Sequence, residues 1–206
     1  MFTGIVEELG HVRHCRPDGA GFSLAVDCDT VLEGTRPGDS IAVNGVCLTV
    51  TELDADGFVT GLAPETRSRT ALDALEAGTP VNLERSVTPS TRMGGHFVQG
   101  HVDATGQVVE RREDADALWV TVQVPATLMR YIVRKGYVAI DGTSLTVVNT
   151  HPDRFDVTLV AYTQAHVTLP QRAVGAAVNI EVDVVGKYVE RLVRPHLDAA
   201  AAGERR

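Results

Sequence analysis

The sequence repeats itself at a spacing of 97 residues, and this duplication constrains the fold more than any other feature of the chain. The segment NGVCLTV at 44–50 recurs as DGTSLTV at 141–147, and VNLE recurs later as VNIE. Moved by 97 without a gap, residues 39–84 match residues 136–181 at 14 of 46 positions, where ordinary residue usage gives roughly three. The chain is therefore expected to contain two copies of one fold.

The boundaries of the two copies follow from the same alignment. Their front parts match at a spacing of 96, so that Gly4-Ile5-Val6 lies over Gly100-His101-Val102. We expect one domain at residues 1–88 and a second at 97–184, each long enough to bury a small core of its own. The stretch from Ser86 to Gly95 contains proline, serine and paired glycines, and we interpret it as the linker.

Apolar and polar residues alternate inside each half, which is the pattern of half-buried β-strands. Gly21–Val26 and Ala117–Val124 show it most clearly. About six short strands per half favour a small closed barrel, because closure leaves no exposed strand edge. The prediction is an all-β protein of two homologous six-stranded closed β-barrels followed by a C-terminal α-helix. Further strands are predicted over Ser40–Val50, Phe58–Ala63, Val138–Asn149 and Arg154–Ala161, and short helical turns over Val31–Glu33, Arg69–Leu75 and Ala126–Val133.

The residues after the second repeat have a different pattern. Val185, Val189, Leu192 and Val193 are spaced as on one face of a helix, and they lie outside both repeats. We therefore predict a C-terminal helix and tail over residues 185–206. Its apolar face can pack on its own barrel or pair with the same helix of other subunits, and the sequence favours neither.

Composition limits the partners of the protein. Acidic side chains outnumber basic ones by 27 to 19, for a net charge of −8, and this excess repels nucleic-acid backbones and anionic membrane surfaces. No stretch reaches the roughly 18 consecutive apolar residues that a membrane-spanning helix needs. Three widely spaced cysteines without clustered histidines disfavour a zinc site and favour a reducing compartment. We expect a cytoplasmic protein with no nucleic-acid or membrane partner and no metal.

The two halves keep a small nucleophilic side chain at the same position, which makes it a candidate functional residue. It is Cys47 in the first half and Ser144 in the second, each followed by Leu-Thr-Val. Thr49 and Thr146 fall two residues later, on the same strand face. Each half thus offers a thiol or hydroxyl beside a threonine, which suits hydrogen bonding to a heteroaromatic ring edge. A β-branched threonine also simply suits a strand, and this alternative stays open.

The most informative difference between the halves is a histidine. Ile5 of the first half corresponds to His101 of the second, within the stretch GGHFVQGH. An imidazole exchanges protons near neutral pH, although a single histidine is as readily structural. His96 lies five residues before His101 and would point to the opposite face of a strand, so the two cannot share a metal. Nucleotide-binding and hydrolase fingerprints are missing, so we expect metal-free chemistry.

Four segments, MFTGIVEELG, SIAVNGVCLTV, GGHFVQGHVD and GTSLTV, together with the duplication, resemble the riboflavin synthase family of the alpha-chain type over nearly all of the 206 residues. The resemblance implies Greek-key barrels of the lumazine-binding type and a homotrimer assembled through the C-terminal helix. It implies a transferase that moves a four-carbon unit between two molecules of 6,7-dimethyl-8-ribityllumazine. The products are riboflavin and 5-amino-6-ribitylaminouracil, in the last step of riboflavin biosynthesis. No cofactor is implied, and an association with lumazine synthase is left open.

The resemblance also implies where two substrate molecules bind. One lumazine is expected in each barrel, and the reacting pair forms between the N-terminal barrel of one subunit and the C-terminal barrel of its neighbour. The N-terminal pocket is expected to use Gly4, Ile5, Val6, Cys47, Leu48, Thr49, Gly61, Leu62, Ala63, Pro64, Glu65 and Thr66. The C-terminal pocket is expected to use Gly100, His101, Val102, Lys135, Ser144, Leu145, Thr146, Thr158, Leu159, Val160, Ala161, Tyr162 and Thr163. The catalytic candidate Ser40, together with Phe2 and Thr3, is expected near the reacting pair.

The catalytic roles are hypotheses built on that resemblance. His101 is expected to move the proton lost by the C7 methyl of one lumazine, with Ser144 and Thr146 orienting that ring. Cys47 is expected to add to or polarise the opposing ring, a role that water or a ribityl hydroxyl could also fill. Asp141 is expected to fix a strand-end turn or to relay a proton.

Two other classes of protein fit parts of this pattern. A non-catalytic lumazine- or flavin-binding antenna protein shares the double barrel but tends to lose ligand-binding residues in one half, whereas both halves here keep theirs. The flavin domain of an oxidoreductase has a similar barrel and is followed by a nucleotide-binding βαβ region, for which residues 184–206 leave no room. The enzyme is therefore the favoured interpretation.

Overall fold

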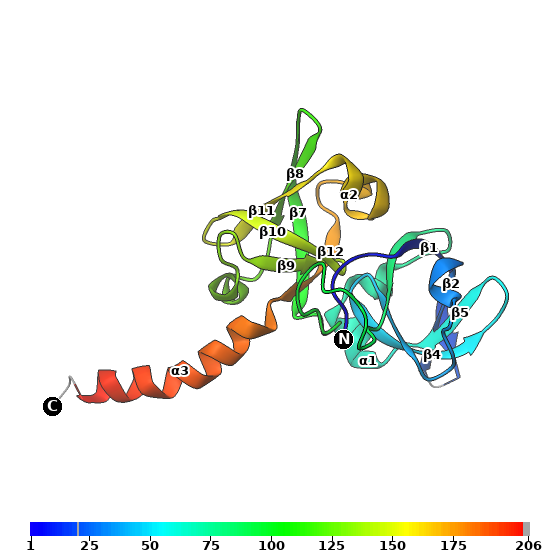
Figure 1. The fold of residues 1–206 in the computed structure, drawn as a ribbon, viewed down its shortest axis with the longest axis horizontal. Coiled ribbons are helices and arrows are strands. Elements are labelled where there is room, and N and C mark those ends of the chain that lie inside the picture. The colour runs from blue at the N-terminus through cyan, green and yellow to red at the C-terminus, as the bar shows by residue number, and fades with distance from the viewer. Residues whose placement is uncertain (20, 204–206) are drawn as a thin grey trace.

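Two closed barrels of six antiparallel strands form the body of the molecule (Figure 1). The structure is a computed structural model that describes residues 1–19 and 21–203. The first barrel contains β1 (Glu8–Asp18), β2 (Gly21–Asp27), β3 (Ser40–Val43), β4 (Val46–Leu53), β5 (Gly57–Gly61) and β6 (Pro80–Arg85). The second contains β7 (Ala104–Asp114), β8 (Ala117–Gln123), β9 (Tyr137–Ile140), β10 (Thr143–Thr150), β11 (Arg154–Leu159) and β12 (Ala177–Val182).

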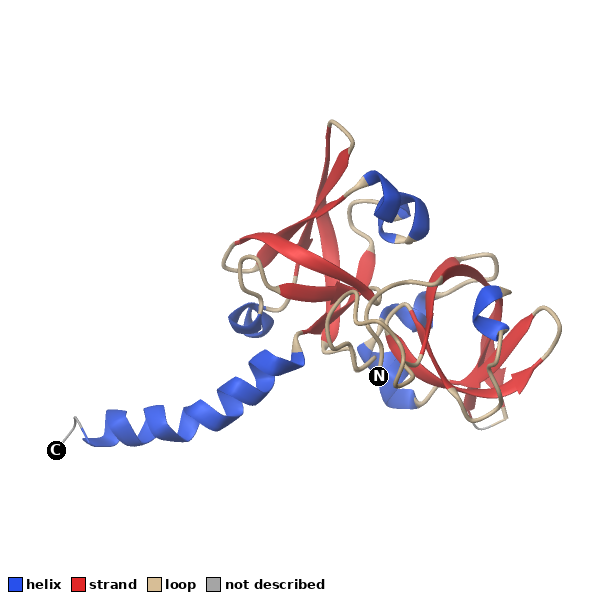
Figure 2. Ribbon diagram, in the orientation of Figure 1, coloured by secondary structure: helices blue, strands red, loops and turns tan. Residues whose placement is uncertain are grey.

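Short helical segments connect the strands, and one long helix ends the chain (Figure 2). The first half carries η1 (Thr30–Leu32), α1 (Pro64–Arg69) and η2 (Ala71–Ala74), and the second half carries η3 (Ala126–Tyr131), α2 (Ala161–His166), η4 (Leu169–Gln171) and the terminal α3 (Val184–Gly203).

Both barrels have the same strand order and the same irregularities. The order is β1-β2-β5-β4-β3-β6 in the first and β7-β8-β11-β10-β9-β12 in the second. The long first strand of each barrel has its register shift at the matching place, after Val12 in β1 and after Val108 in β7. The predicted fold class, two homologous closed six-stranded barrels with a C-terminal helix, is thus confirmed.

Each barrel is filled by the alternating apolar residues that defined its strands. Phe58 of β5 and Phe155 of β11 occupy matching positions and are both fully buried. Burying a side chain of this size contributes roughly 2–3 kcal/mol relative to leaving it exposed. Because each barrel has its own continuous cluster of buried residues, the repeats form two separate cores.

Several local predictions differ from the structure. The predicted strands Ser40–Val50 and Val138–Asn149 are each two strands joined by a tight turn, and Asn44, Gly45, Asp141 and Gly142 in these turns have positive φ. The predicted strand Phe58–Ala63 ends at Gly61, and the predicted strand Arg154–Ala161 ends at Leu159, so that Ala161 begins α2 instead. The pocket segments after β5 and β11 each continue as a six-residue helix. In α1 a proline at the first helical position and an acid in the first turn are the signal for this helix.

The N-terminal segment crosses to the second barrel, and the segment that follows the linker crosses to the first. Phe2 pairs with Val98 through two backbone hydrogen bonds of 2.7 and 3.1 Å between nitrogen and oxygen. Beyond this bridge Val6 packs against the core of the second barrel, while Val102 packs against the core of the first. The chain therefore exchanges matching segments between its two halves, and the N-terminus lies where the barrels meet (Figure 1).

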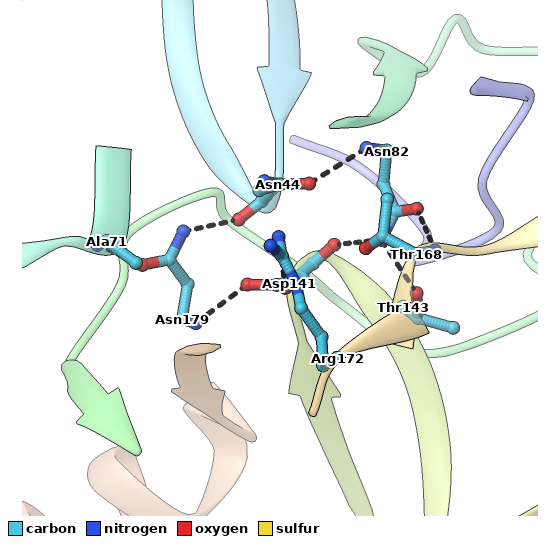
Figure 3. A network of polar contacts seen from close by, with 8 residues as sticks. All are labelled: Asn44, Ala71, Asn82, Asp141, Thr143, Thr168, Arg172 and Asn179. Carbon is cyan, nitrogen blue, oxygen red and sulfur yellow. Dashed lines mark hydrogen bonds and ion pairs between the residues drawn. The ribbon is translucent and has the colours of Figure 1, made fainter. Parts of the chain in front are cut away.

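A hydrogen-bond network joins the barrels across an approximate twofold axis (Figure 3). The Nδ2 atom of Asn82 donates to the backbone oxygen of Asp141 at 2.7 Å. In the matching contact, Nδ2 of Asn179 donates to the backbone oxygen of Asn44 at 2.8 Å. These side chains are buried, so each unmade bond would leave a polar group without solvent. The network therefore fixes the turns that carry Asn44 and Asp141 in both barrels.

Helix α3 leaves the second barrel and projects away from both barrels (Figure 1). Its first two turns are tied to the body, because Lys187 lies 2.7 Å from Asp103 and Glu190 lies 2.7 Å from Arg130. The predicted apolar stripe stays uncovered, with exposed fractions of 43–69% for Val185, Val189, Leu192 and Val193. The helix therefore does not bury this stripe on its own barrel, which was one of the two alternatives. Residues 204–206 of the predicted tail lie outside the described residues.

Candidate functional site

Two glycines bring the exchanged segments into contact with the candidate nucleophiles. The backbone oxygen of Gly4 accepts from the N–H of Ser144 at 2.8 Å, and that of Gly100 accepts from the N–H of Cys47 at 2.9 Å. A Cβ added to either glycine would lie 2.6 Å from the Cβ of the residue it faces. Both glycines have positive φ, 77° and 78°. Glycine fits these two positions because it has no Cβ to clash and adopts a positive φ without strain.

These contacts show that the predicted grouping of the pocket residues is wrong. The expected N-terminal pocket combined the segment Gly4–Val6 with Cys47, and the expected C-terminal pocket combined the segment Gly100–Val102 with Ser144. The structure pairs Gly4 with Ser144 and Gly100 with Cys47. The physical reason is the segment exchange, which no local pattern reveals because both segments match equally well in the repeat alignment.

A buried glutamate holds each crossover segment in place. Glu84 of β6 accepts from the N–H groups of Thr3 and Gly4 at 2.7 and 3.0 Å. The matching Glu181 of β12 accepts from the N–H groups of Gln99 and His101 at 2.6 and 2.9 Å. Burial raises the pKa of both carboxyl groups, and the hydrogen bonds from these N–H groups oppose the rise. The two glutamates thus hold the segments that form the candidate site, although the sequence showed them only as matching positions of the repeat.

A pocket of about 550 Å³ opens beside Cys47, within the size range of small-molecule sites. The crossover segment forms one wall and the first turns of α1 form another. Cys47 and His101 line this same pocket, so the structure brings the two main catalytic candidates together within one chain. The predicted residues that line it are Cys47, Ala63, Glu65, Thr66, Gly100, His101 and Val102, joined by Val46, Arg69, Thr70 and Asp103.

Several residues predicted to bind substrate in the first barrel do not line the Cys47 pocket. Leu48 and Leu62 point into the core, with exposed fractions of 5% and 3%. Pro64 is exposed at the first position of α1, and Gly61 ends β5. Thr49 is exposed on β4, where it pairs with Ser40 of β3.

Residues predicted near the reacting pair separate into two environments. Phe2 is fully buried between the barrels, beside Ala42, Ala139 and Cys47. Thr3, Ile5 and Ser40 line a different pocket of about 750 Å³, under the linker and beside Glu84. The N-terminal segment therefore contributes Phe2 to the contact between the barrels and Thr3 and Ile5 to the larger pocket.

His96, which was not predicted as a site residue, lies beside Ser144. Nδ1 of His96 lies 2.7 Å from Oγ of Ser144, and the His96 ring stacks on Tyr137 with centroids 5.2 Å apart. Burial lowers the pKa of His96, so its ring is held neutral. The strand argument about His96 and His101 was wrong because this segment is irregular, apart from the bridge at Val98.

The other predicted residues of the second barrel occupy core, surface and helical positions. Leu145 and Leu159 are core residues. Thr146 is exposed on β10 opposite Tyr137, and Lys135 is exposed on the loop before β9, with its N–H bonded to Val147. The remaining predicted positions are Thr158 at the end of β11, the exposed Val160 that precedes α2, and Ala161, Tyr162 and Thr163 within α2.

Asp141 is a structural residue in this arrangement and does not line the Cys47 pocket. It has no exposed surface, accepts from the N–H of Asn179 at 2.8 Å, and pairs with Arg172 at 3.1 Å. Its φ is 43°, as the expected strand-end turn requires. Burial raises its pKa, and the charge of Arg172 opposes this rise. Of the two roles considered for Asp141, its contacts fit turn fixation.

Within residues 1–19 and 21–203 no helix is long and apolar enough to cross a membrane. The same residues contain no cluster of three or more His, Cys, Asp or Glu side chains arranged to hold a metal ion.

Comparison with known proteins places this site in a family. The model of the lumazine binding domain matches twice, at residues 3–86 and 99–183. The riboflavin synthase of Schizosaccharomyces pombe is 46% identical over 96% of this chain and 96% of its own length. That of Mycobacterium tuberculosis is 48% identical over 94% of this chain and 98% of its own length, and that of Bacillus subtilis is 38% identical over 94% and 90%.

A solved structure has the same fold. LumP in complex with 6,7-dimethyl-8-(1'-D-ribityl) lumazine superposes with a TM-score of 0.80 over 88% of this chain and 99% of its own, at 23% identity. At that identity the likeness concerns the fold alone.

Proposed function

The chain belongs to the riboflavin synthase family, and we propose that it converts two molecules of 6,7-dimethyl-8-ribityllumazine into riboflavin and 5-amino-6-ribitylaminouracil. The duplicated site carries this proposal, because each barrel presents a small nucleophilic side chain against a crossover glycine. Two matching sites suit a reaction whose two substrates are identical, since holding both removes the entropic cost of their encounter. The two products together contain every atom of the two substrates, so the four-carbon transfer is balanced without an external oxidant.

Cys47 and His101 are assigned different tasks in the same pocket. Cys47 acts on the ring held inside the pocket, by adding to it or by polarising it. His101 is exposed at the pocket wall, so its imidazole can serve a second ring that faces the first. The imidazole takes the proton of the C7 methyl and returns it when the diamine product leaves. Addition of the thiol is reversed in the same step, which regenerates the cysteine.

We propose that the protein assembles as a homotrimer and that contacts between the α3 helices hold the subunits together. The exposed stripe of α3 continues beyond the predicted residues to Leu197, which is 63% exposed. Lys187 ties the helix to Asp103, a lining residue of the Cys47 pocket. In the trimer the Ser144 site of one subunit faces the Cys47 pocket of the next. A Leu192→Glu variant is expected to be monomeric by light scattering and to lose turnover. Cytoplasmic location and association with lumazine synthase stay predictions of the sequence.

The activity is tested by incubating the purified protein with the lumazine and following riboflavin absorbance. Conversion supports the enzyme, and a stable unconverted complex would instead support the antenna protein. Cys47→Ala is expected to slow turnover about tenfold, equivalent to about 1.4 kcal/mol of barrier, with riboflavin binding and oligomeric state retained. Cys15→Ala is the matched control because Cys15 does not line this pocket. Unchanged turnover in Cys47→Ala would remove the proposed role of the thiol.

A further inference from the structure

His96 combines three features that a purely structural histidine need not share. It is only 7% exposed. Its Nδ1 lies within hydrogen-bond distance of the Ser144 hydroxyl, while its Nε2 is buried without a partner among the described residues. Its ring stacks almost parallel to that of Tyr137, at an interplanar angle of 10°. The imidazole is therefore held in one orientation, with one nitrogen committed to Ser144.

This arrangement exists in the second barrel, and the described residues of the first barrel contain no matching pair of side chains. Cys47 occupies the position of Ser144, and its thiol makes no hydrogen bond within the described part of the chain. The two sites thus differ in a polar group that one has and the other lacks.

The unpartnered Nε2 indicates which nitrogen carries the proton. A buried N–H without a partner is rarer and more costly than a buried acceptor without one. A neutral ring with its proton on Nε2 would bury such an N–H, whereas the Nδ1–H tautomer buries only a lone pair. In the favoured tautomer Nδ1–H donates to Oγ of Ser144. The Ser144 hydroxyl has then accepted one bond, and its own O–H is free to donate.

We propose that His96 is a positioning residue that sets the Ser144 hydroxyl as a hydrogen-bond donor toward an acceptor atom on the heteroaromatic ring bound at the second barrel. The inference rests on the proposed function for the identity of that ring. Gly95 supports it, because a Cβ there would lie 2.8 Å from the Cβ and 3.0 Å from the Oγ of Ser144. The side chain of Ser144 is therefore confined by His96 and by a glycine that leaves it room.

The test compares ring substitutions that keep or remove the donor. His96→Asn places an amide N–H near the position of Nδ1, and His96→Phe keeps an aromatic ring against Tyr137 without any donor. Riboflavin is the probe, titrated by fluorescence into the full-length protein, and Ser144→Ala marks the site at the second barrel. His96→Phe is expected to weaken the site that Ser144→Ala weakens by about three- to tenfold, the effect of one hydrogen bond. His96→Asn is expected to stay within about twofold of the wild type.

A double variant separates positioning from simple support of the fold. If His96 acts through Ser144, His96→Phe causes no further loss of riboflavin affinity in the Ser144→Ala background. An equal loss in both backgrounds, or unchanged affinity in His96→Phe, would overturn the inference. Where His96→Phe does not fold, His96→Gln replaces it, because its longer side chain carries the amide past the Nδ1 position. Nitrogen NMR of the His96 ring gives a direct second readout, and a proton on Nε2 in the wild type would also overturn it.

These outcomes are distinguishable from failure of the proposed function. Wild-type protein that binds riboflavin but does not convert the lumazine would contradict the enzyme and leave the binding comparison intact. Wild-type protein that converts the lumazine while His96→Phe binds normally would contradict only the role of His96.

Discussion

The two barrels have the same strand order and the same bulges, yet they differ at candidate site residues and in the network between them. Cys47, Ile5 and Asn44 of the first half correspond to Ser144, His101 and Asp141 of the second. Because segments are exchanged, His101 serves the Cys47 pocket of the first barrel, while the Ser144 side has His96. The comparison shows that the two halves kept one strand arrangement and diverged at the residues to which we assign the chemistry.

Matching residues make matching contacts where the barrels meet, and three experiments break or sharpen this symmetry. A fourth experiment addresses the histidine that only one half has. The expected effects decrease in the order given.

The largest effect is expected where the two backbones meet at the twofold axis. A Cβ on Gly45 would lie 2.5 Å from the backbone nitrogen of Gly142, and its φ is 75°. Gly45→Ala is therefore expected to lower the free energy of unfolding by about 4 kcal/mol, from backbone strain and overpacking together. Gly78→Ala is the control, because Gly78 has a φ of 84° and open space around it; a loss of about 1 kcal/mol is expected there. Equal losses in urea unfolding would contradict the tight barrel contact.

The next effect tests a charged pair, Asp141 and Arg172, that breaks the symmetry of the network. Leu75 stands where the second half has Arg172, at a spacing of 97. Arg172→Leu makes the halves alike at this position but leaves the fully buried Asp141 without its partner. A loss of about 3 kcal/mol is expected at neutral pH. Without the arginine the pKa of Asp141 rises further, so the loss shrinks as the pH falls and the carboxyl group becomes neutral.

A double variant checks the cause of that loss. Asp141→Asn restores the residue type of Asn44, and Asp141→Asn combined with Arg172→Leu is expected to recover about 2 of the 3 kcal/mol at neutral pH. Thermal unfolding across pH measures both variants. A loss in Arg172→Leu that is independent of pH would show that packing, and not the buried charge, is responsible.

A smaller effect compares the two asparagines of the network. Asn82 accepts from the N–H of Thr168 at 2.8 Å, and Asn179 accepts from the N–H of Ala71 at 2.7 Å. Asn82→Ala and Asn179→Ala are each expected to cost about 2 kcal/mol, because each removes buried hydrogen bonds and leaves their partners unpaired. The two losses should agree within about 0.5 kcal/mol if the axis is also symmetric in energy. A clear difference would locate the asymmetry in the network itself.

The smallest effect concerns pH and His96. Burial lowers the pKa of His96, and the nearby charge of Asp183 only partly opposes this. Below about pH 6.5 the unfolded chain therefore binds more protons than the folded chain. Stability is expected to fall as the pH decreases through this range, and His96→Asn should make the fall shallower. An unchanged pH profile of unfolding in His96→Asn would contradict a neutral, buried His96.

The sequence predicted the fold well because its signals were local or repeated. Alternation around Phe58 and Phe155 defined core strands, and the 97-residue spacing revealed two barrels and the helix beyond them. The short helix at Pro64 was missed although its proline and acid were readable. Cys47 and His101 were identified because the halves differ there, which is a comparison that a single sequence can make with itself.

The sequence by itself determined that one scaffold was copied, which residues fill each core, and which few positions diverged. Only the tertiary structure decided which of those positions meet. Gly4 and Gly100 occupy matching places in the repeat, so pairing within a half and pairing across halves are equally consistent with the alignment. The Phe2–Val98 bridge and the glycine contacts select the crossed pairing, because the segments that form the sites are held by backbone hydrogen bonds between residues far apart in the chain.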